Sequence, residues 1–413
     1  MNGYGISKAE LKKHNRICIL QTILESGPIS RIDIARKLHI TRGAITVLSN
    51  EMIQQNIIRE VGDGQGDNVV KGQKGRRKVL LDIDYDRYFL LGACVDENNI
   101  SIGLTTLDGR SLEKSNILID RKCTAENAAE IIRISVDGIL RHSGMDMSSV
   151  IGMGVAVMPA AFSIEGITGI SGEPDYRHIE SLVSKRLNIP VYAGNGINLL
   201  ALASFGGAGR ERTVANRALI YADRNRIRVS VVCGNHIRSD ADEGGEDISY
   251  MCVRPDGVRE DGYCKGSARA ELTATAIGRK VSGIINSIDT PELCRLTGGS
   301  SKAVTLGQLL SAYSGGDEVL RQLRMETLDS FCLMLNNISV AFGTDRLSLC
   351  GFGLSQSQLS EIHRHAEAFG GREFADKIRL CHIDRLHGFV SGCAYAAING
   401  FFRTGGAIGC DEM

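Results

Sequence analysis

The pattern of apolar residues changes once along this chain, near residue 85, and this change constrains the fold more than any other feature. Before it, apolar residues recur at helical spacing, as Ile17, Leu20 and Leu24 do. After it, short apolar runs such as FLLGACV (89–95) alternate with helix-like stretches. Alternating strands and helices predict a largely parallel sheet covered by helices. We therefore expect a small helical head followed by an α/β body with two similar lobes.

Charge divides the chain at nearly the same place. Residues 1–80 contain 14 Lys and Arg against 7 Asp and Glu, which gives +7, and the remainder contains 34 against 41, which gives −7. A basic head on an acidic body is typical of a protein that meets nucleic acid at one end only. A basic face that is merely solvated is the alternative interpretation of the charge alone.

Composition excludes several other classes of protein. Hydrophobic residues make up 43% of the chain and charged residues 23%, which are values of a globular protein and not of a disordered one. The sequence has no uncharged apolar run of 18 residues and no signal-peptide core at its start, so we expect a cytoplasmic protein without a membrane partner. The 12 cysteines form no CxxC pair, and we interpret them as reduced thiols.

The head has the pattern of a helix-turn-helix. We expect a first helix over about 13–25, a second that begins after Ser30 and ends near His39, and a third that begins after Thr41. The buried faces should consist of Ile32, Ala35 and Leu38 in the second helix and of Ile45, Leu48 and Met52 in the third. Two short helices joined by a tight turn form this motif.

The outward face of the third helix carries residue types that suit DNA recognition. Side chains that read bases are hydrogen-bonding types near the start of such a helix, and small neighbours permit close approach. A strand at 57–61, a glycine-rich loop and a returning strand at 79–81 then predict a wing with a basic tip. The predicted DNA-binding residues are Ser30, Arg31, Thr41, Arg42, Gly43, Thr46, Asn50, Lys74, Arg76, Arg77 and Lys78. A protein-docking module is the alternative for this head.

The run GPISRIDIARKLHITRGAITVLSNEMIQQNIIRE, followed by GQKGRRKVLLDID, resembles the N-terminal winged helix of the ROK family of repressors, open reading frames and kinases. The resemblance extends with gaps over essentially the whole chain. It implies a winged helix-turn-helix over 1–82 and a two-lobed, actin-like and ribonuclease H-type body over 86–413. Lobe one would comprise about 86–205 plus 387–413, and lobe two about 206–386.

The resemblance also shows which kinase groups are missing. Cys94-Val95-Asp96 stands where the family has the Asp-x-Gly of its first phosphate motif, and Asn195-Gly196 stands where it has a catalytic Asn-Asp pair. Glycine cannot act as a base, so we expect no enzyme activity, no catalytic residue and no cofactor. Arg226, Ile227, Arg228 and Ser230 occupy the second phosphate motif, and only Gly351-Phe352-Gly353 resembles the family's adenosine-side turn.

The zinc and sugar sites of the family are only partly present. Tyr250, Gly262, Cys264 and Arg269 stand where the resemblance places one His and three Cys ligands, so we expect no metal. The residues that match sugar-contacting positions are Asn195, Glu246 or Asp247, and Glu271. An intact sugar site and a cleft that holds another ligand, or none, both remain open at this stage.

Together these features predict a DNA-binding transcriptional regulator, a repressor of carbohydrate-related genes, whose body is a non-catalytic effector or oligomerisation domain. Its expected partners are a double-stranded operator, a sugar effector and further copies of itself in a homodimer or homotetramer. The alternatives are a ROK-type sugar kinase with a regulatory head, and a regulator controlled by a protein partner.

Overall fold

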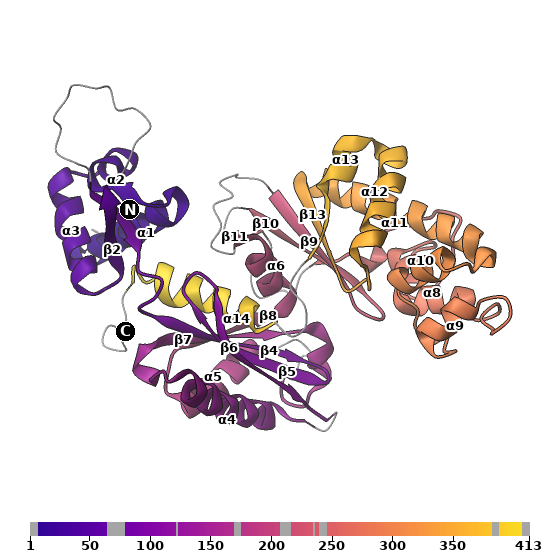
Figure 1. The fold of residues 1–413 in the computed structure, drawn as a ribbon, viewed down its shortest axis with the longest axis horizontal. Coiled ribbons are helices and arrows are strands. Elements are labelled where there is room, and N and C mark those ends of the chain that lie inside the picture. The colour runs from indigo at the N-terminus through magenta and orange to yellow at the C-terminus, as the bar shows by residue number, and fades with distance from the viewer. Residues whose placement is uncertain are drawn as a thin grey trace, which may run out of the picture.

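The structure is a computed structural model that describes residues 7–63, 79–120, 123–168, 175–206, 216–233, 236–238, 246–381 and 388–406. It contains three β-sheets, one in the head and one in each lobe of the body. Figure 1 shows the head at the left beside lobe one, and lobe two at the right.

The head is a winged helix-turn-helix. Its elements are α1 (Lys8–Ser26), β1 (Ile29–Ser30), α2 (Arg31–Leu38), α3 (Arg42–Gln54), β2 (Ile58–Asp63) and β3 (Val79–Ile83). The sheet has the order β1-β3-β2. The first helix begins earlier than predicted because Ser7 and Glu10 form a capping box.

One buried face in the head differs from the prediction. Ile45, Leu48 and Met52 of α3 are buried as expected, but in α2 it is Ile34 that is fully buried, whereas Ile32 is 38% exposed. The prediction for Ile32 was therefore wrong. Ile34 and Leu38, four residues apart, share the face of α2 that packs in the core of the head, and Ile32, two residues from Ile34, points away from that face.

Lobe one is built on a five-stranded mixed sheet with the order β6-β5-β4-β7-β8. Its elements are β4 (Phe89–Asp96), β5 (Asn99–Thr106), β6 (Ser111–Leu118), α4 (Ala125–Ser143), β7 (Val150–Val157), α5 (Tyr176–Leu187), β8 (Val191–Asn195) and α6 (Gly196–Gly206). The pairs β4–β7 and β7–β8 are parallel, but β4–β5 and β5–β6 are antiparallel, so the expectation of a largely parallel sheet was wrong, here and in the equally mixed sheet of lobe two. The short turn between Asp96 and Asn99 can join only antiparallel strands.

Lobe two repeats the same strand order as β11-β10-β9-β13-β14, with β12 paired to β10. Its strands are β9 (Asn216–Ala222), β10 (Ile227–Cys233), β11 (His236–Ile237), β12 (Glu246–Asp247), β13 (Thr344–Cys350) and β14 (Ile378–Leu380). Its helices are α7 (Ala268–Leu272), α8 (Ala274–Val281), α9 (Pro291–Thr297), α10 (Leu306–Ser314), α11 (Arg321–Phe342), α12 (Gln356–Gly370) and α13 (Arg372–Lys377), preceded by the 3₁₀ turn η3 (Ile248–Tyr250). Two sheets of one topology confirm the ribonuclease H-type, actin-like fold class.

The C-terminal helix α14 (Phe389–Ala396), continued by the π-helix η6 (Ala397–Phe402), returns to pack on lobe one and lies next to the head (Figure 1). It fits closely because Gly92, Gly103 and Gly154 stand side by side on β4, β5 and β7. A Cβ at Gly154 would overlap the carbonyl oxygen of Gly392, and one at Gly103 would overlap the ring of Phe389. The three glycines thus form the floor on which α14 lies.

One hydrophobic core joins the head to lobe one. Head residues such as Ile19, Met52 and Ile57 belong to the same buried cluster as Ile151 of lobe one and Phe401 of η6. At the end of η6, the Nε of Arg16 donates a 2.8 Å hydrogen bond to the carbonyl oxygen of Gly405. The head is therefore packed onto the body and not merely tethered to it.

Candidate nucleic-acid interface and inter-lobe cleft

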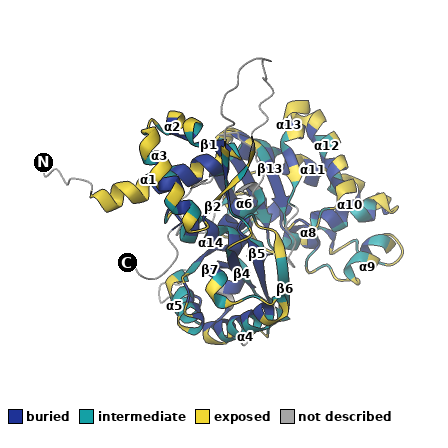
Figure 2. Cartoon of the chain, turned by 60° about the vertical axis from the view of Figure 1, so that its left-hand side comes forward, coloured by how far each residue is buried: buried dark blue, intermediate teal, exposed yellow. Residues whose placement is uncertain are grey.

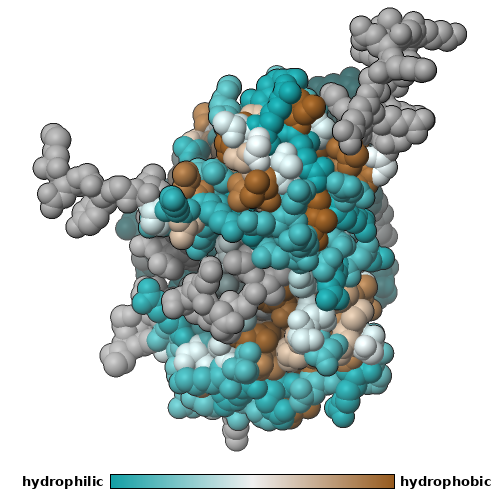
Figure 3. Space-filling model, turned by 90° about the vertical axis from the view of Figure 1, so that its left-hand side faces the viewer, coloured by the Kyte–Doolittle hydropathy of each residue, from teal (hydrophilic) through white to brown (hydrophobic). Residues whose placement is uncertain are grey.

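The outward face of α3 is the first candidate site. Thr41 caps this helix by accepting a hydrogen bond from the Ala44 amide, and Arg42, Gly43, Thr46 and Asn50 are all exposed. Figure 2 shows α3 with this face exposed, and Figure 3, which looks onto the side of the molecule that carries the head, shows a mainly hydrophilic surface there. The hydroxyl of Thr46 donates to the carbonyl oxygen of Arg42 (2.8 Å), so its methyl group and the two lone pairs of its oxygen remain for a partner.

Arg31 holds three elements of the head together. Its Nε donates to the Ser49 hydroxyl (2.9 Å), and its Nη2 donates to the Asn50 Oδ1 (3.1 Å) and to Glu60 of β2 (2.9 Å). Arg31 therefore orients Asn50 and links α2, α3 and the wing.

The remaining predicted DNA contacts divide into two groups. Ser30 is only 3% exposed and its hydroxyl is engaged with Asp33 in the first turn of α2, so its side chain does not face solvent. Lys74, Arg76, Arg77 and Lys78 at the predicted tip of the wing lie outside the described residues. The strands β2 and β3 that would carry this tip pair antiparallel, as a wing requires.

The sequence analysis missed one residue of the α3 surface. Val47 lies between Thr46 and Leu48 and its side chain is 59% exposed. An exposed apolar side chain beside hydrogen-bonding ones suits contact with a thymine methyl group in the major groove. The signal was present in the sequence, since Val47 falls outside the stripe formed by Ile45, Leu48 and Met52.

The second candidate site is the cleft between the lobes, with a volume of about 1830 Å³. It lies where the parallel strands of both sheets end: Met158 follows β7, Ala222 ends β9 and Cys350 ends β13, and all three line it. Polar residues from the turn between β9 and β10 and from β4, β10 and β12 also line it, namely Asp96, Asp223, Arg224, Asn225, Arg226, Arg228 and Asp247.

The cleft holds the remnants of the kinase motifs. Gly196 lines the wall of the cleft where the family resemblance implies the aspartate of the catalytic Asn-Asp pair, so that position supplies no carboxylate. Arg226, which belongs to the second phosphate motif, forms an ion pair with Asp247 of β12 (3.3 Å). Gly351 and Gly353 also line the cleft, but a Cβ at Gly351 would overlap the carbonyl oxygen of Ala222, so packing alone accounts for that glycine.

Two of the residues expected at a sugar site, Asn195 and Glu271, are buried and hydrogen-bonded within the protein. Asn195 is 1% exposed, and its Oδ1 accepts from the amides of Ile197 and Asn198 while its Nδ2 donates to the Tyr176 hydroxyl. Glu271 is equally buried and is paired with Lys280.

The other two residues, Glu246 and Asp247, form the strand β12. Asp247 lines the cleft and, besides its pair with Arg226, accepts from the Ser249 amide (3.0 Å). Glu246 lies on β12, where its backbone pairs with Val229. Asp247 is therefore placed to meet a ligand in the cleft.

The positions implied for zinc do not form a metal site. Cys264 donates through its thiol to the carbonyl oxygen of Tyr250 (3.0 Å), and Arg269 and Tyr250 supply no metal ligand. Within the described parts of the chain, no group of three or more His, Cys, Asp or Glu residues could hold a metal ion. One thiol of the expected four ligands is too few for structural zinc.

Comparisons with known proteins agree with this architecture. The model of the MarR family matches residues 13–61. The xylose repressor of Caldicellulosiruptor bescii is 26% identical over 209 residues, which cover 48% of this chain and 50% of that protein. The chain spans only 50–60% of the length of this protein and of a second similar relative, a putative xylose repressor of another Caldicellulosiruptor strain.

Two solved structures share the fold. One, described as a ROK family transcriptional regulator homologous to the Mlc protein of E. coli, superposes with a TM-score of 0.70 at 16% identity and covers 96% of this chain and 97% of its own. The other, a ROK hexokinase from Thermus thermophilus, gives a TM-score of 0.57 at 18% identity and covers 75% of this chain and 98% of its own.

These likenesses define a class of protein: a helix-turn-helix head on a two-lobed, sugar-kinase-like body. The chain shares the fold of these two ROK-family structures, and residues 13–61 of its winged helix-turn-helix match the MarR family model. Within the described residues, no helix has both the length and the apolar character needed to cross a bilayer.

Proposed function

We propose that this protein is a sequence-specific DNA-binding regulator, most simply a repressor. The observation that carries the proposal is the exposed face of α3, where Arg42, Thr46, Val47 and Asn50 stand on a helix held rigidly by its buried stripe. In the major groove, Arg42 would bind a guanine, Asn50 an adenine, and Val47 a thymine methyl group. A repressor function agrees with the name of the xylose repressor to which the chain is similar.

The units that carry this function are proposed to be residues 1–82, as the DNA-binding domain, and residues 86–413, as the effector and oligomerisation domain. Thr41 and the wing residues Lys74, Arg76, Arg77 and Lys78 would contact phosphates or the minor groove. Two copies related by a two-fold axis would present two α3 helices to a palindromic site, with half-sites one helical turn apart.

The C-terminal helix offers a physical link between the cleft and the head. Gly388 and Ser391 at its start line the cleft, and Phe401 and Gly405 at its far end contact the head. A ligand that binds differently to the open and closed cleft would shift the equilibrium between them. Because α14 is packed on both parts, we infer that this shift moves the head and changes operator affinity.

The body is proposed to bind its effector without phosphorylating it. The main support is Gly196, which lines the cleft where the family resemblance implies a catalytic aspartate and has no side chain that could act as a base. Sugars are the effector class to test first, and pentoses among them, since relatives are named xylose repressors. A coupled assay with ATP and a panel of hexoses and pentoses should give no turnover above that of the buffer. Turnover that a cleft substitution abolishes would favour the kinase alternative.

Selection of random duplexes by the purified full-length protein tests the central proposal. We expect enrichment of a palindromic motif whose half-sites lie about 10 base pairs apart. The same selection with Arg42→Ala should change or weaken the enriched motif. Enrichment of no motif, with duplexes retained only according to charge, would reject sequence-specific regulation.

A further inference from the structure

The segment between η3 and α7, residues 251–267, crosses the surface of lobe two with no helix or strand of its own apart from one bridge between Cys252 and Ser267. Long segments of this kind need specific contacts to hold one conformation. The family resemblance implies that zinc supplies those contacts, yet the ligands are missing here. Residues of this chain must therefore hold the segment in another way.

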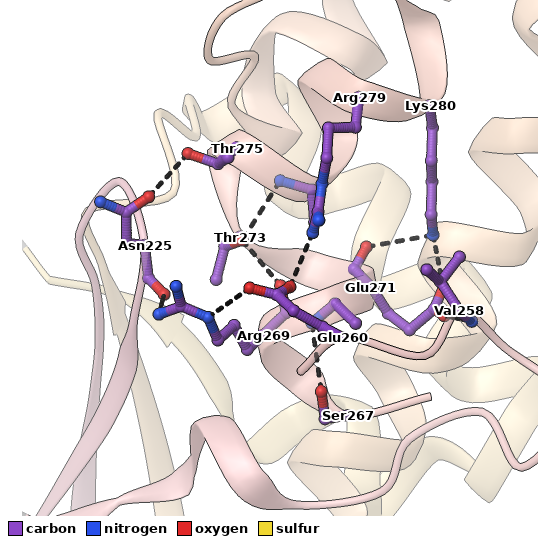
Figure 4. Close-up of polar contacts among 12 residues, drawn as sticks. Asn225, Val258, Glu260, Ser267, Arg269, Glu271, Thr273, Thr275, Arg279 and Lys280 are labelled. Atoms are coloured by element: carbon purple, nitrogen blue, oxygen red, sulfur yellow. Dashed lines mark hydrogen bonds and ion pairs between the residues drawn. The ribbon is translucent and has the colours of Figure 1, made fainter. Parts of the chain in front are cut away.

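Figure 4 shows part of the group of side chains that stands in place of a metal. Glu260, in the middle of the segment, accepts from Arg269 (2.7 Å) and from Arg279 (2.7 Å). The Arg269 guanidinium also lies over the ring of Tyr263 (4.8 Å), and that ring stacks on Tyr250 with 4.4 Å between centroids. We call Tyr250, Glu260, Tyr263, Arg269 and Arg279 the loop cluster.

The loop cluster occupies positions where the resemblance implies zinc ligands. Tyr250 and Arg269 stand at two of those four positions, and both take part in the cluster. Glu260 and Arg269 are mostly shielded from solvent, with side chains 19% and 25% exposed. Although burial opposes ionisation of Glu260, hydrogen bonds from Arg269 and Arg279 hold the pKa of its carboxyl below the usual value. The carboxylate is thus charged and doubly bonded at neutral pH.

A second contact, made by the buried Glu271, holds the same segment two residues before Glu260, at Val258. Glu271 of α7, 1% exposed, accepts from the Val258 amide (2.6 Å) and pairs with Lys280. Gly257 passes so close that a Cβ there would overlap the Glu271 carboxylate. The segment is therefore fixed at both Val258 and Glu260.

The loop cluster also reaches the cleft. Arg269 donates through Nη1 to the carbonyl oxygen of Asn225 (2.9 Å), in the turn between β9 and β10. Thr275 donates its hydroxyl to the Asn225 Oδ1 (2.8 Å), and its amide donates to the carbonyl oxygen of Arg224 (3.1 Å). Arg224 and Asn225 line the cleft. One network thus connects the surface segment to the wall of the ligand site.

We propose that the loop cluster replaces a structural metal ion, so that residues 251–267 and the cleft turn at 223–226 are held in place without zinc. Glu260 is the positioning residue at its centre, because it bonds both arginines. This proposal concerns lobe two alone and does not depend on DNA binding.

Limited trypsin digestion of the full-length protein tests this directly, since Lys265 is an exposed cleavage site within the segment. Metal content is measured first, and EDTA and then zinc chloride are added before digestion. We expect far less than one zinc per chain, and cleavage after Lys265 that neither addition changes. Stoichiometric zinc, or faster cleavage after Lys265 in EDTA, would overturn the proposal.

The variant Glu260→Gln should increase the rate of cleavage after Lys265 at least about tenfold, because two charge-assisted bonds are weakened and cleavage follows the open population. The matched control is Glu318→Gln, which weakens an exposed pair with Arg321 on the same lobe and should leave the rate unchanged. The milder Arg279→Gln keeps the Glu260–Arg269 pair and should give an intermediate rate if Glu260→Gln does not fold. Equal rates in the wild type, the Arg279 variant and the control would contradict the proposal.

Discussion

Arg42 is the first residue of α3, and its exposed side chain stands beside Gly43 and Thr46. If it binds a guanine through two hydrogen bonds, Arg42→Ala should lower affinity for the cognate site by about 1–3 kcal/mol and relax the preference at one base. The matched control is Arg372→Ala, which removes an arginine whose side chain is 84% exposed on lobe two. Both variants are titrated with operator DNA. If Arg42→Ala and Arg372→Ala lower the affinity by the same amount, Arg42 does not take part in base recognition.

The thiols divide by burial. Burial raises the pKa of Cys332 and of Cys393 to about 12, so both are protonated and shielded at pH 8. Cys252 and Cys264 are exposed. Iodoacetamide at pH 8 should therefore alkylate Cys252 and Cys264 within minutes and leave Cys332 and Cys393 unmodified in the native protein, as peptide mass spectrometry can check. Equal rates at Cys393 and Cys252 would contradict the packing of α14.

At the residue scale, the sequence predicted which side chains are buried better than it predicted their hydrogen-bond and ion-pair partners. The stripe of Ile45, Leu48 and Met52 and the exposure of Arg42 follow from helical periodicity, which needs only local information. Asn195 and Glu271 were expected to bind a sugar, but Asn195 caps α6 and Glu271 pairs with Lys280. Lys280 lies on the next helix, α8, and the Asn195 partner Tyr176 lies on α5, and periodicity within one element does not specify such contacts.

At the scale of elements, the close packing of α14 on Gly92, Gly103 and Gly154 predicts how substitutions at these glycines change the stability of the protein. Gly154→Ala places a methyl group against the backbone of Gly392, which cannot move without shifting the helix, so we expect a loss of about 1–3 kcal/mol in the free energy of unfolding. Gly138→Ala in α4 is the matched control, because nothing lies within 4 Å of its added methyl group. That change should stabilise the protein by about 0.5–1 kcal/mol. Urea unfolding of the two variants measures both, and equal stabilities would mean that α14 is loosely packed.

Most strands and long helices could be predicted from the sequence, and the exceptions have a physical cause. The third helix was predicted to begin after Thr41, where the structure begins α3 at Arg42, because Thr41 is a capping residue and Ile45, Leu48 and Met52 form a clear apolar stripe. The short helices α7 to α10 were not predicted at all. With only five to nine residues each, they show too few turns for periodicity to register and form through packing on the core of lobe two.

At the scale of the whole molecule, the shared core of the head and lobe one predicts how the protein unfolds. Because Ile19, Met52 and Phe401 are buried in one cluster, the head should have no melting transition of its own. Hydrogen exchange in increasing denaturant should expose α1, α3 and β4 together. Loss of protection in α3 well before β4 would show that the head is an independent unit, and the proposed route from the cleft through α14 would then fail.

The central claim is that the head recognises a DNA sequence. It is tested most directly by fluorescence anisotropy of the full-length protein on the DNA upstream of its own gene, compared with a scrambled duplex of the same composition at about 0.15 M salt. We predict binding to the native duplex at least about a thousandfold tighter than to the scrambled one, and a marked weakening by Arg42→Ala but not by Arg372→Ala. Equal and weak binding to both duplexes, unchanged by Arg42→Ala, would contradict the account.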